Sequence, residues 1–501
     1  MLPPAIALFS RLLKDEGHSV ALFDTTDYPS LEFDSLDSDK KKQTNLNSRP
    51  FSVDRLEKSR KSENPLLAYG KRVDQFEPDL LAFSCTEDMF PIALKLMSVS
   101  AQQNIPTIVG GVFPTFAGDL CFKYPEIDMV CIGEGEHVLV DLCRRMSSGS
   151  SYDDIPGLWV KKSDQSIVKN RMGKVVDMDA NPILDLSIFD EGRLYRPMQG
   201  HVWKMFPLET HRGCPYKCAF CNSPSQWTKY REETNTIHFR KKNVNKIREE
   251  IIYFRDTHKV EAFYFWADTF FAYSIKEFDE FLEMYSEFNI PFWCQTRPET
   301  VTQERVEQLA KVGMFRIAFG IEHGNQEFRK KYIKRDISNE RIIQAMQLMD
   351  STGIPYSVNN ILGFPFETRE LTFDTIELNR RFTPDSQNAY SFSPFHGTDL
   401  RVLAEREGFI KPGVIARSIT RPTILDMPQY SAVEIEGMRR CFLLYVKLPR
   451  SRWHEVKRAE ELTKEGDKIW EELRDEVEET YFKPLWASKS LDFEKMALGD
   501  D

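Results

Sequence analysis

The sequence predicts an α/β protein with an N-terminal doubly wound parallel sheet, a partial (βα)6 TIM-like barrel and a helical C-terminal segment. Short apolar segments alternate with helical patterns over most of the 501 residues, which is typical of parallel sheets covered by helices. One irregular stretch interrupts the alternation, and a highly charged segment with helical periodicity follows it at the end. The length and the 41% hydrophobic content allow several domains.

The first domain is expected to span residues 1–165. Its apolar segments have the length of single buried strands, and turn residues separate them from helical patterns. The expected strands are residues 20–23, 79–83, 107–109 and 128–132, and the expected helices are residues 6–13, 91–103 and 138–146. Residues 37–60 are basic and polar, and we expect a loop there.

An interdomain linker is expected at residues 166–205, which contain prolines and few periodic stretches. Six strand–helix units then predict a barrel over residues 206–425. The expected strands are residues 208–211, 262–266, 292–296, 316–320, 357–362 and 389–393, and the helices are residues 244–256, 275–288, 303–312, 340–353 and 370–382. Residues 426–501 predict amphipathic helices that cover the body of the protein.

Charge and composition exclude several classes of protein. The net charge of -10 does not indicate a basic surface for nucleic-acid binding. No apolar run has the length of a membrane span, and the start of the chain does not have the pattern of a signal peptide. Nine cysteines, an odd and sparse set, favour a reducing compartment over a disulfide framework. We therefore expect a cytoplasmic protein.

Three of the cysteines, Cys214, Cys218 and Cys221, lie within eight residues and indicate a metal site. Thiolates at spacings of four and three can surround a cuboidal iron–sulfur cluster from one compact loop. Three ligands for four irons leave one iron open to a substrate or cofactor. The alternative is a structural zinc site with His211 or a distant residue as fourth ligand.

This CxxxCxxC pattern, with the aromatic Phe220 before the third cysteine, resembles the radical S-adenosylmethionine (SAM) superfamily. The resemblance covers residues 206–400. It implies a 4Fe–4S cluster whose open iron binds the amino and carboxylate groups of SAM, and reductive cleavage of SAM to methionine and a 5'-deoxyadenosyl radical. It also implies an electron donor such as flavodoxin or ferredoxin.

Strand ends further along the chain resemble other motifs of the same superfamily. Asp268 matches the acidic segment that faces the amino group of SAM, although Ala267 replaces a second acid there. Glu322 matches the acid that reaches the ribose hydroxyls. The remaining implied cofactor contacts are Gly363 and Pro365 beside the adenine, where Phe366 stands at a common glycine position, and Arg297 as an anchor for a carboxylate of cofactor or substrate.

Small residues follow the expected strands of the first domain. They are Ser84, Gly110, Gly111, Gly133 and Gly135. A doubly wound sheet binds ligands at the carboxyl edge of its strands, and glycines there let a large cofactor approach the backbone. These residues are therefore candidate cofactor contacts.

Together with the barrel, residues 109–115 and 131–136 resemble signatures of the cobalamin-binding radical SAM enzymes. The resemblance covers residues 1–400 and implies bound cobalamin. The chain has no Asp-x-His-x-x-Gly motif, so the cofactor is expected base-off, its lower face open or water-ligated. Pro3 and Pro4 open the chain where the family has a preceding strand, so we expect a truncated start or a sheet that lacks one element and exposes a strand edge.

The resemblance implies a cobalamin-dependent methyltransferase that methylates an unactivated carbon of a small molecule. A radical cyclase, oxidase or ring-rearranging enzyme would use the same cofactors. A methylthiotransferase would need a second cysteine triplet, for which the first domain offers Cys85, Cys121, Cys131 and Cys143. A cobalamin or iron–sulfur sensor without catalysis is the remaining alternative.

Overall fold

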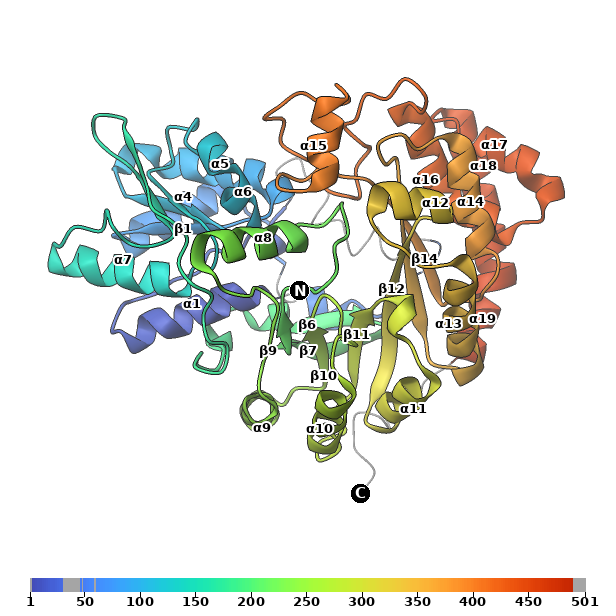
Figure 1. The fold of residues 1–501 in the computed structure, drawn as a ribbon, viewed down its shortest axis with the longest axis horizontal. Helices are drawn as coiled ribbons and strands as arrows, with labels where there is room; N and C mark the ends of the chain where they lie inside the picture. The colour runs from blue at the N-terminus through green and yellow to red at the C-terminus, as the bar shows by residue number, and fades with distance from the viewer. Residues whose placement is uncertain (1, 30–45, 47, 58–59, 490–501) are drawn as a thin grey trace.

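The computed structural model describes residues 2–29, 46, 48–57 and 60–489. Much of the loop expected at residues 37–60 lies outside these residues. A first α/β domain, a curled central sheet and a group of C-terminal helices follow one another across the molecule (Figure 1). This is the order of domains that the sequence predicts.

The first sheet has five strands in the order β1-β2-β3-β4-β5. Strands β1 (Leu81–Ser84), β2 (Thr107–Gly110) and β3 (Met129–Cys131) are parallel, and β4 (Leu158–Lys161) and β5 (Ile167–Lys169) continue the sheet antiparallel. The helices of this domain are α1 (Pro4–Asp15), α3 (Asp54–Glu57), α4 (Pro65–Phe76), α5 (Phe90–Ser100), α6 (Val112–Cys121) and α7 (Glu136–Ser148). Helices cover the sheet, which explains why its central strands are almost purely apolar.

The strand predicted at residues 20–23 is not formed. The backbone there is outside the sheet, and β1 is the edge strand, with Ala82 and Ser84 exposed. A strand needs a neighbour to pair with, and an apolar pattern alone does not supply one. Phe23 packs instead against Tyr28 and Tyr69. The exposed edge that the sequence led us to expect is present.

The second sheet has seven strands in the order β14-β13-β12-β11-β10-β7-β6. They are β6 (Tyr195–Met198), β7 (His201–Glu209), β10 (Ala262–Trp266), β11 (Phe292–Thr296), β12 (Met314–Glu322), β13 (Tyr356–Leu362) and β14 (Ser386–Ser391). All neighbours except β6 and β7 pair parallel, which gives the six parallel strands of a partial barrel. The linker prediction was too wide, because β5 and β6 both lie within residues 166–205.

Helices cover the convex face of this sheet. They are α9 (Val244–His258), α10 (Ile275–Tyr285), α11 (Gln303–Lys311), α13 (Asn339–Thr352) and α14 (Arg369–Asn379), while α8 (Ser223–Thr234), α12 (Gln326–Phe328) and α15 (Asp399–Arg406) lie at the carboxyl end of the strands. The core between sheet and helices contains Phe206, Phe263, Phe292, Ile317 and Val358. The residues between these on each strand therefore face the concave side.

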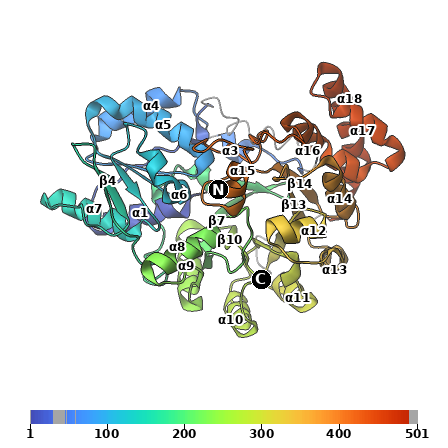
Figure 2. The same ribbon diagram turned by 45° about the horizontal axis from the view of Figure 1, so that its top comes forward.

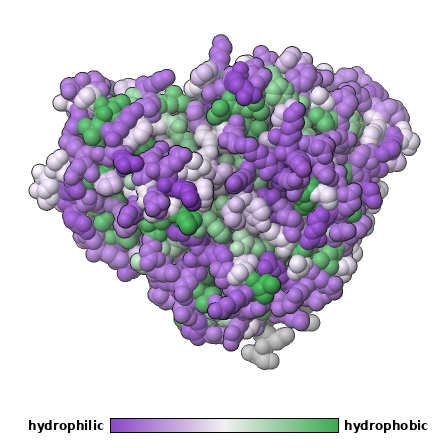
Figure 3. All heavy atoms as spheres, viewed as in Figure 1, coloured by the Kyte–Doolittle hydropathy of each residue, from purple (hydrophilic) through white to green (hydrophobic). Residues whose placement is uncertain are grey.

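The described part of the chain ends in helices that lie beside the barrel, of which Figure 2 labels α16, α17 and α18. They are α16 (Ala432–Lys447), α17 (Trp453–Ala459), α18 (Lys464–Val477) and α19 (Lys483–Ser488). Buried Glu460 fixes them to the barrel, because Arg369 of α14 donates two hydrogen bonds to its carboxylate. Hydrophilic side chains dominate the face seen in Figure 3. Within the described ranges, no helix combines the length and apolarity needed to cross a membrane.

Candidate active site

The three clustered cysteines lie on one loop between β8 (His211–Arg212) and α8. Gly213 opens the loop with φ +82°, and a Cβ there would lie 2.6 Å from Nδ1 of His238. The Cys221 amide donates a hydrogen bond to the Cys218 carbonyl at 3.1 Å, which folds the loop back on itself. All three thiols are free and partly exposed. The three cysteines therefore share one folded loop.

Desolvation raises the pKa of each of these thiols, that of Cys221 to about 12. Thiolates therefore need a nearby positive charge at neutral pH. Bound iron supplies such charge, and iron–sulfur clusters take thiolate ligands. The donor set thus fits a cluster with three protein ligands and one open iron.

His211, the ligand considered for a zinc site, faces away from this role. Its ring lies 4.3 Å from that of Tyr273 and stacks on Phe239, and its Nδ1 is 2.8 Å from the Thr210 hydroxyl. Burial lowers the pKa of His211 to about 3. In the part of the chain that the structure describes, no three His, Cys, Asp or Glu side chains form a site for a single metal ion.

Arg297, predicted as an anchor, contacts the cysteine loop directly. Its guanidinium donates a hydrogen bond to Sγ of Cys218 at 3.0 Å and lies 3.8 Å above the ring of Tyr216. Glu299 binds the other side of the guanidinium, and Arg335 joins Glu299 to Glu322. A chain of alternating charges therefore links the second cysteine to the acid predicted to face the ribose.

Asp268 follows β10 and lies beside the first and third cysteines. The Ser223 hydroxyl donates to its carboxylate at 3.0 Å, and Thr269 places its hydroxyl 3.5 Å from Sγ of Cys214. Asp268 keeps an exposed surface, yet desolvation by the surrounding protein raises its pKa. An exposed carboxylate next to the cluster loop can accept hydrogen bonds from an amino group.

Glu322 ends β12 with a φ of +69°, at a bulge in the pairing with β13. Arg335 donates to its carboxylate at 3.0 Å, and burial raises the pKa of the carboxyl despite this partner. A Cβ on Gly320 would lie 2.1 Å from Glu322 Oε1. The glycine thus leaves room for the carboxylate on the concave side of the sheet.

Gly363 and Pro365 form a buried turn after β13. A carboxylate that the sequence did not single out, Glu367, holds this turn. It accepts hydrogen bonds from the amides of Gly363 at 2.7 Å and Phe364 at 2.9 Å, and it is fully buried. The turn is therefore rigid before any cofactor binds.

Two aromatic residues of the predicted site also pack here. Phe366 has a φ of +66°, and its ring contacts Tyr332 and Phe409. Phe220 of the cysteine loop contacts Phe364 with ring centroids 6.2 Å apart. The cysteine loop and the turn after β13 therefore share one apolar cluster.

The glycines of the first domain have protein neighbours on the side where a Cβ would project. That atom would lie 2.6 Å from the Cys85 carbonyl at Gly111 and 2.7 Å from the Tyr230 hydroxyl at Gly133. At Gly135 it would lie 2.9 Å from Phe9, and at Gly110 it would lie 3.3 Å from Cys131. Internal packing explains these glycines, whereas Ser84 is exposed at the edge.

Ion pairs fix the first domain to the cysteine loop. Arg212 stands two residues before Cys214 and donates to Glu136 at 2.7 Å and to Glu209 at 2.8 Å. Glu134 lies 3.3 Å from Arg212 and also accepts a hydrogen bond from Arg240. Glu134 and Glu136 follow β3, so the carboxyl edge of the first sheet is held against the start of the cluster loop.

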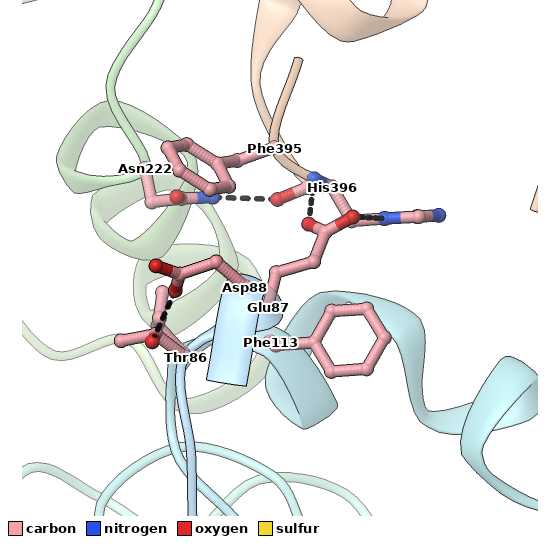
Figure 4. Close-up of a pocket in the computed structure, with 8 residues that line it drawn as sticks. Thr86, Glu87, Asp88, Phe113, Asn222, Phe395 and His396 are labelled. Atoms are coloured by element: carbon pink, nitrogen blue, oxygen red, sulfur yellow. Dashed lines mark hydrogen bonds and ion pairs between the residues drawn. The ribbon is translucent and has the colours of Figure 1, made fainter. Parts of the chain in front are cut away.

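A cavity of about 150 Å³ lies between the two domains (Figure 4). Its lining residues are Thr86, Glu87, Asp88, Val112, Phe113, Asn222, Phe395 and His396. Glu87 is 2% exposed and accepts hydrogen bonds from the backbone amide and Nδ1 of His396, both at 2.7 Å. Asn222, next to Cys221, donates to the His396 carbonyl at 2.6 Å. The cavity thus joins the edge of the first sheet to the cluster loop.

Comparisons with known proteins agree with this arrangement. Residues 208–378 match the radical SAM superfamily, and residues 64–143 match the B12 binding domain. An uncharacterized methyltransferase of Pyrococcus horikoshii is 23% identical over 76% of this chain and 81% of its own length. The anaerobic magnesium-protoporphyrin IX monomethyl ester cyclase of Rubrivivax gelatinosus is 26% identical over 74% of this chain and 67% of its own length.

The fold is similar to that of the radical SAM methyltransferase TsrM from Kitasatospora setae, solved with cobalamin and a [4Fe-4S] cluster. The TM-score is 0.62 at 13% identity, over 95% of this chain and 97% of that chain. The chain therefore joins a B12-binding domain to a radical SAM domain, as in the cobalamin-binding radical SAM enzymes. Its cofactors are a 4Fe–4S cluster, SAM and cobalamin.

Residues at the edge of the first sheet suit part of the cobalamin. Ser84 and Thr86 are exposed there, and the cavity continues toward the cluster loop. The volume of about 150 Å³ is far smaller than a corrin ring with its side chains. The whole cofactor thus fits only if the cofactor extends over the open edge or the contact between Glu87 and His396 widens.

Proposed function

We propose that this cobalamin-dependent radical SAM enzyme is a methyltransferase that methylates an unactivated carbon of a small molecule. The observation that carries the proposal is the cavity between the domains, since its lining includes Thr86 at the cobalamin side and Asn222 beside Cys221. A substrate carbon placed there would be within reach of both cofactors. The relative from Pyrococcus horikoshii, named an uncharacterized methyltransferase, supports the same reaction class.

When bound, the cluster and SAM supply hydrogen abstraction, and cobalamin supplies the methyl group. The protein residues bind and orient these groups. We infer that Asp268 accepts hydrogen bonds from the SAM amino group, because its carboxylate is exposed beside two cluster cysteines. Glu322, held by Arg335, would accept from the ribose hydroxyls. The rigid turn at Gly363 would lie against the adenine.

A ring-forming or oxidising enzyme with the same cofactors is the second candidate. The 26% identity to the Rubrivivax gelatinosus cyclase favours it, and that match covers 74% of this chain. The products differ, because a cyclase product loses hydrogen whereas a methylated product gains one carbon. High-resolution mass spectrometry of the product therefore separates the two reactions.

The other two alternatives have less support. Three of the four first-domain cysteines that a methylthiotransferase would need, Cys85, Cys121 and Cys131, are buried, and their thiol pKa values are raised by desolvation. Such thiols behave as small apolar side chains. A sensor without catalysis would not need acids such as Asp268 and Glu322 at the strand ends of the barrel.

We also infer an external one-electron donor of the flavodoxin or ferredoxin type. Four exposed lysines lie on the cluster loop or on the helix that contacts it. They are Lys217 on the loop itself, and Lys330, Lys331 and Lys334 in or next to the π-helix Arg329–Ile333, where Asp336 pairs with Lys330 and Asp399 with Lys334. The Ile333 carbonyl accepts a hydrogen bond from the Ala219 amide at 2.9 Å, which joins this helix to the loop. Reduction by flavodoxin should slow as the salt concentration rises. Reduction by a small chemical reductant at a fixed concentration should change little over the same range of salt.

Nine free cysteines and an oxygen-sensitive cluster fit a reducing compartment, and we infer a cytoplasmic location. Fractionation of cells that produce the protein at native levels tests this inference. Recovery with a cytoplasmic marker enzyme is expected. Recovery with a secreted or periplasmic marker would contradict it.

The central test uses protein reconstituted without oxygen. The wild type should convert SAM into both 5'-deoxyadenosine and S-adenosylhomocysteine, since one SAM is cleaved and another donates methyl. Cys218→Ala should abolish 5'-deoxyadenosine, and the matched control Cys143→Ala, a partly exposed thiol on α7, should not. Survival of SAM cleavage in Cys218→Ala would refute the cluster assignment. A wild type that formed no S-adenosylhomocysteine with substrate present would refute methyl transfer.

A further inference from the structure

One wall of the barrel carries an arginine on its concave face. On β12, Ile317 and Phe319 point into the core beneath the helices. Because successive side chains of a strand point to opposite faces, Arg316 faces the concave side. It donates a hydrogen bond to the Ser386 hydroxyl of β14 at 3.1 Å, and β13 lies between these two strands. The guanidinium therefore lies across the concave surface, where it is partly exposed.

Positive charge is in excess around this arginine. The nearby carboxylate is Asp385, which is 2% exposed and already pairs with Arg49 at 2.8 Å and Lys489 at 3.5 Å. Among the residues that the structure describes, three cations thus share one carboxylate. Keeping a cation away from water without a counter-charge is costly, so this part of the barrel favours an added anion.

Other hydrogen-bond donors face the same space. Tyr390 and Asn359 are partly exposed on β14 and β13, and Tyr390 lies near Arg316. Within the described ranges, the Tyr390 hydroxyl has no hydrogen-bond partner, and Asn359 uses its oxygen to accept from Asn388 at 2.9 Å. The Asn359 amide nitrogen and the Tyr390 hydroxyl therefore remain available to a ligand.

Aromatic side chains cover the part of the concave wall next to Arg316. The rings of Tyr264 and Trp293 stack face to face, with centroids 4.0 Å apart and planes at 17°, and Tyr264 is only 6% exposed. Trp266 is 38% exposed and packs edge-on against Tyr264, with ring centroids 5.8 Å apart and planes at 66°. Trp293 is the direct pairing neighbour of Arg316 and is partly exposed, so the aromatic surface begins beside the cation.

We propose that the barrel binds a ring-containing substrate with one oxyanionic group, which Arg316 holds while the ring packs against the exposed parts of Trp293 and Trp266. This inference rests on the proposed function for the reaction, but not for the binding itself. Glu322 lies six positions after Arg316 along β12, which is roughly 20 Å at the usual rise of a strand. The reacting carbon is therefore remote from the anionic group.

The test measures binding of three probes of the same shape to the full-length reconstituted protein. They are 2-naphthoate, 2-naphthyl phosphate and neutral 2-naphthamide, titrated by equilibrium dialysis. A charge-assisted hydrogen bond from an arginine should make at least one oxyanion bind about tenfold tighter than the amide, or more. Carboxylate and phosphate are separate arms, so the preferred one identifies the group. A wild type that binds both no better than the amide overturns the proposal.

Variants localise the effect. Arg316→Met should lose the preference for oxyanions, while the matched control Arg406→Met, at a 70% exposed arginine, should keep it. Arg316→Lys keeps the charge and should retain most of the preference. This variant therefore separates loss of the positive charge from a folding defect at position 316. Trp293→Leu should weaken all three probes alike. An Arg316→Met protein with normal iron content that still prefers oxyanions contradicts the site.

Failure of the proposed function would look different. A wild type with an intact cluster that forms neither SAM product would refute the reaction but leave the oxyanion preference in place. Conversely, methyl transfer without any oxyanion preference would keep the reaction and refute Arg316 as the anchor.

Discussion

Replacing Arg297 with glutamine should make the cluster harder to reduce. The guanidinium lies 3.0 Å from Sγ of Cys218 and its side chain is 12% exposed, so solvent screens it only in part. Reduction adds one negative charge to the cluster, which this cation stabilises. Removing the cation therefore lowers the midpoint potential.

The size of the shift follows from Coulomb's law. Two unit charges 4 Å apart interact by about 4 kcal/mol at an effective dielectric constant of 20. The added electron is spread over the cluster, and Glu299 beside Arg297 offsets part of the positive charge. We therefore take about 1–2 kcal/mol, which is a fall of roughly 40–90 mV for a one-electron couple.

A redox titration followed by electron paramagnetic resonance, without SAM, measures this potential. Omitting SAM separates the effect on the cluster from any contact between Arg297 and the cofactor. Arg297→Lys keeps the charge and should shift the potential less than Arg297→Gln. An Arg297→Gln protein with full iron content and the wild-type midpoint would refute the reasoning.

Three further changes have expected outcomes that thermal unfolding can measure. Gly320→Ala should cost about 2 kcal/mol, because its Cβ would lie 2.1 Å from Glu322 Oε1, and an unchanged midpoint would show that Glu322 moves freely. Glu367→Gln should cost about 2 kcal/mol through weaker hydrogen bonds to the turn at Gly363, and a wild-type melting temperature would contradict the assigned bracing role. Burial opposes ionisation of Asp185, but hydrogen bonds from Lys14 and other donors lower its pKa to about 2. The ionised carboxylate therefore stabilises the fold fully above about pH 4–5, and this stabilisation is lost as the pH falls toward 2. Asp185→Asn should therefore destabilise the protein at pH 7 and hardly at pH 2, and an equal loss at both would contradict this.

The predictions for the cysteine loop and for Glu322 rest on local patterns. The cysteine loop depends on residues within eight positions, and the motif at Glu322 lies at the end of an apolar run that forms β12. Strand 20–23 failed for a non-local reason, since its apolar pattern is suitable but the structure places no paired strand beside it. The length and the apolar pattern of a segment cannot show whether a neighbouring strand is present to pair with it.

Other features could not be predicted because they join distant residues. Glu87 and His396 are 309 positions apart, and neither stands in a pattern that points to the other. Gly133 was singled out as a glycine that lets a cofactor approach the backbone, and a Cβ there would lie 2.7 Å from the hydroxyl of Tyr230, a residue of the other domain. Sequence reasoning identifies such positions without identifying what fills the space.

Two of the contacts between the domains, at Arg212 and at Glu87, differ in strength, and this determines where the cavity between the domains can widen for cobalamin. Arg212 pairs with Glu136 and Glu134 as ionised groups, whereas Glu87 accepts three hydrogen bonds, two of them from the backbone amides of His396 and Ala416. Charge-assisted pairs between two ions are the harder ones to separate. We therefore expect the cavity to open at Glu87 while Arg212 keeps the sheet edge against the cysteine loop. Hydrogen exchange at the His396 and Ala416 amides should then rise when cobalamin is added and exchange around β8 should not. Faster exchange at β8 alone would place the opening on the other side.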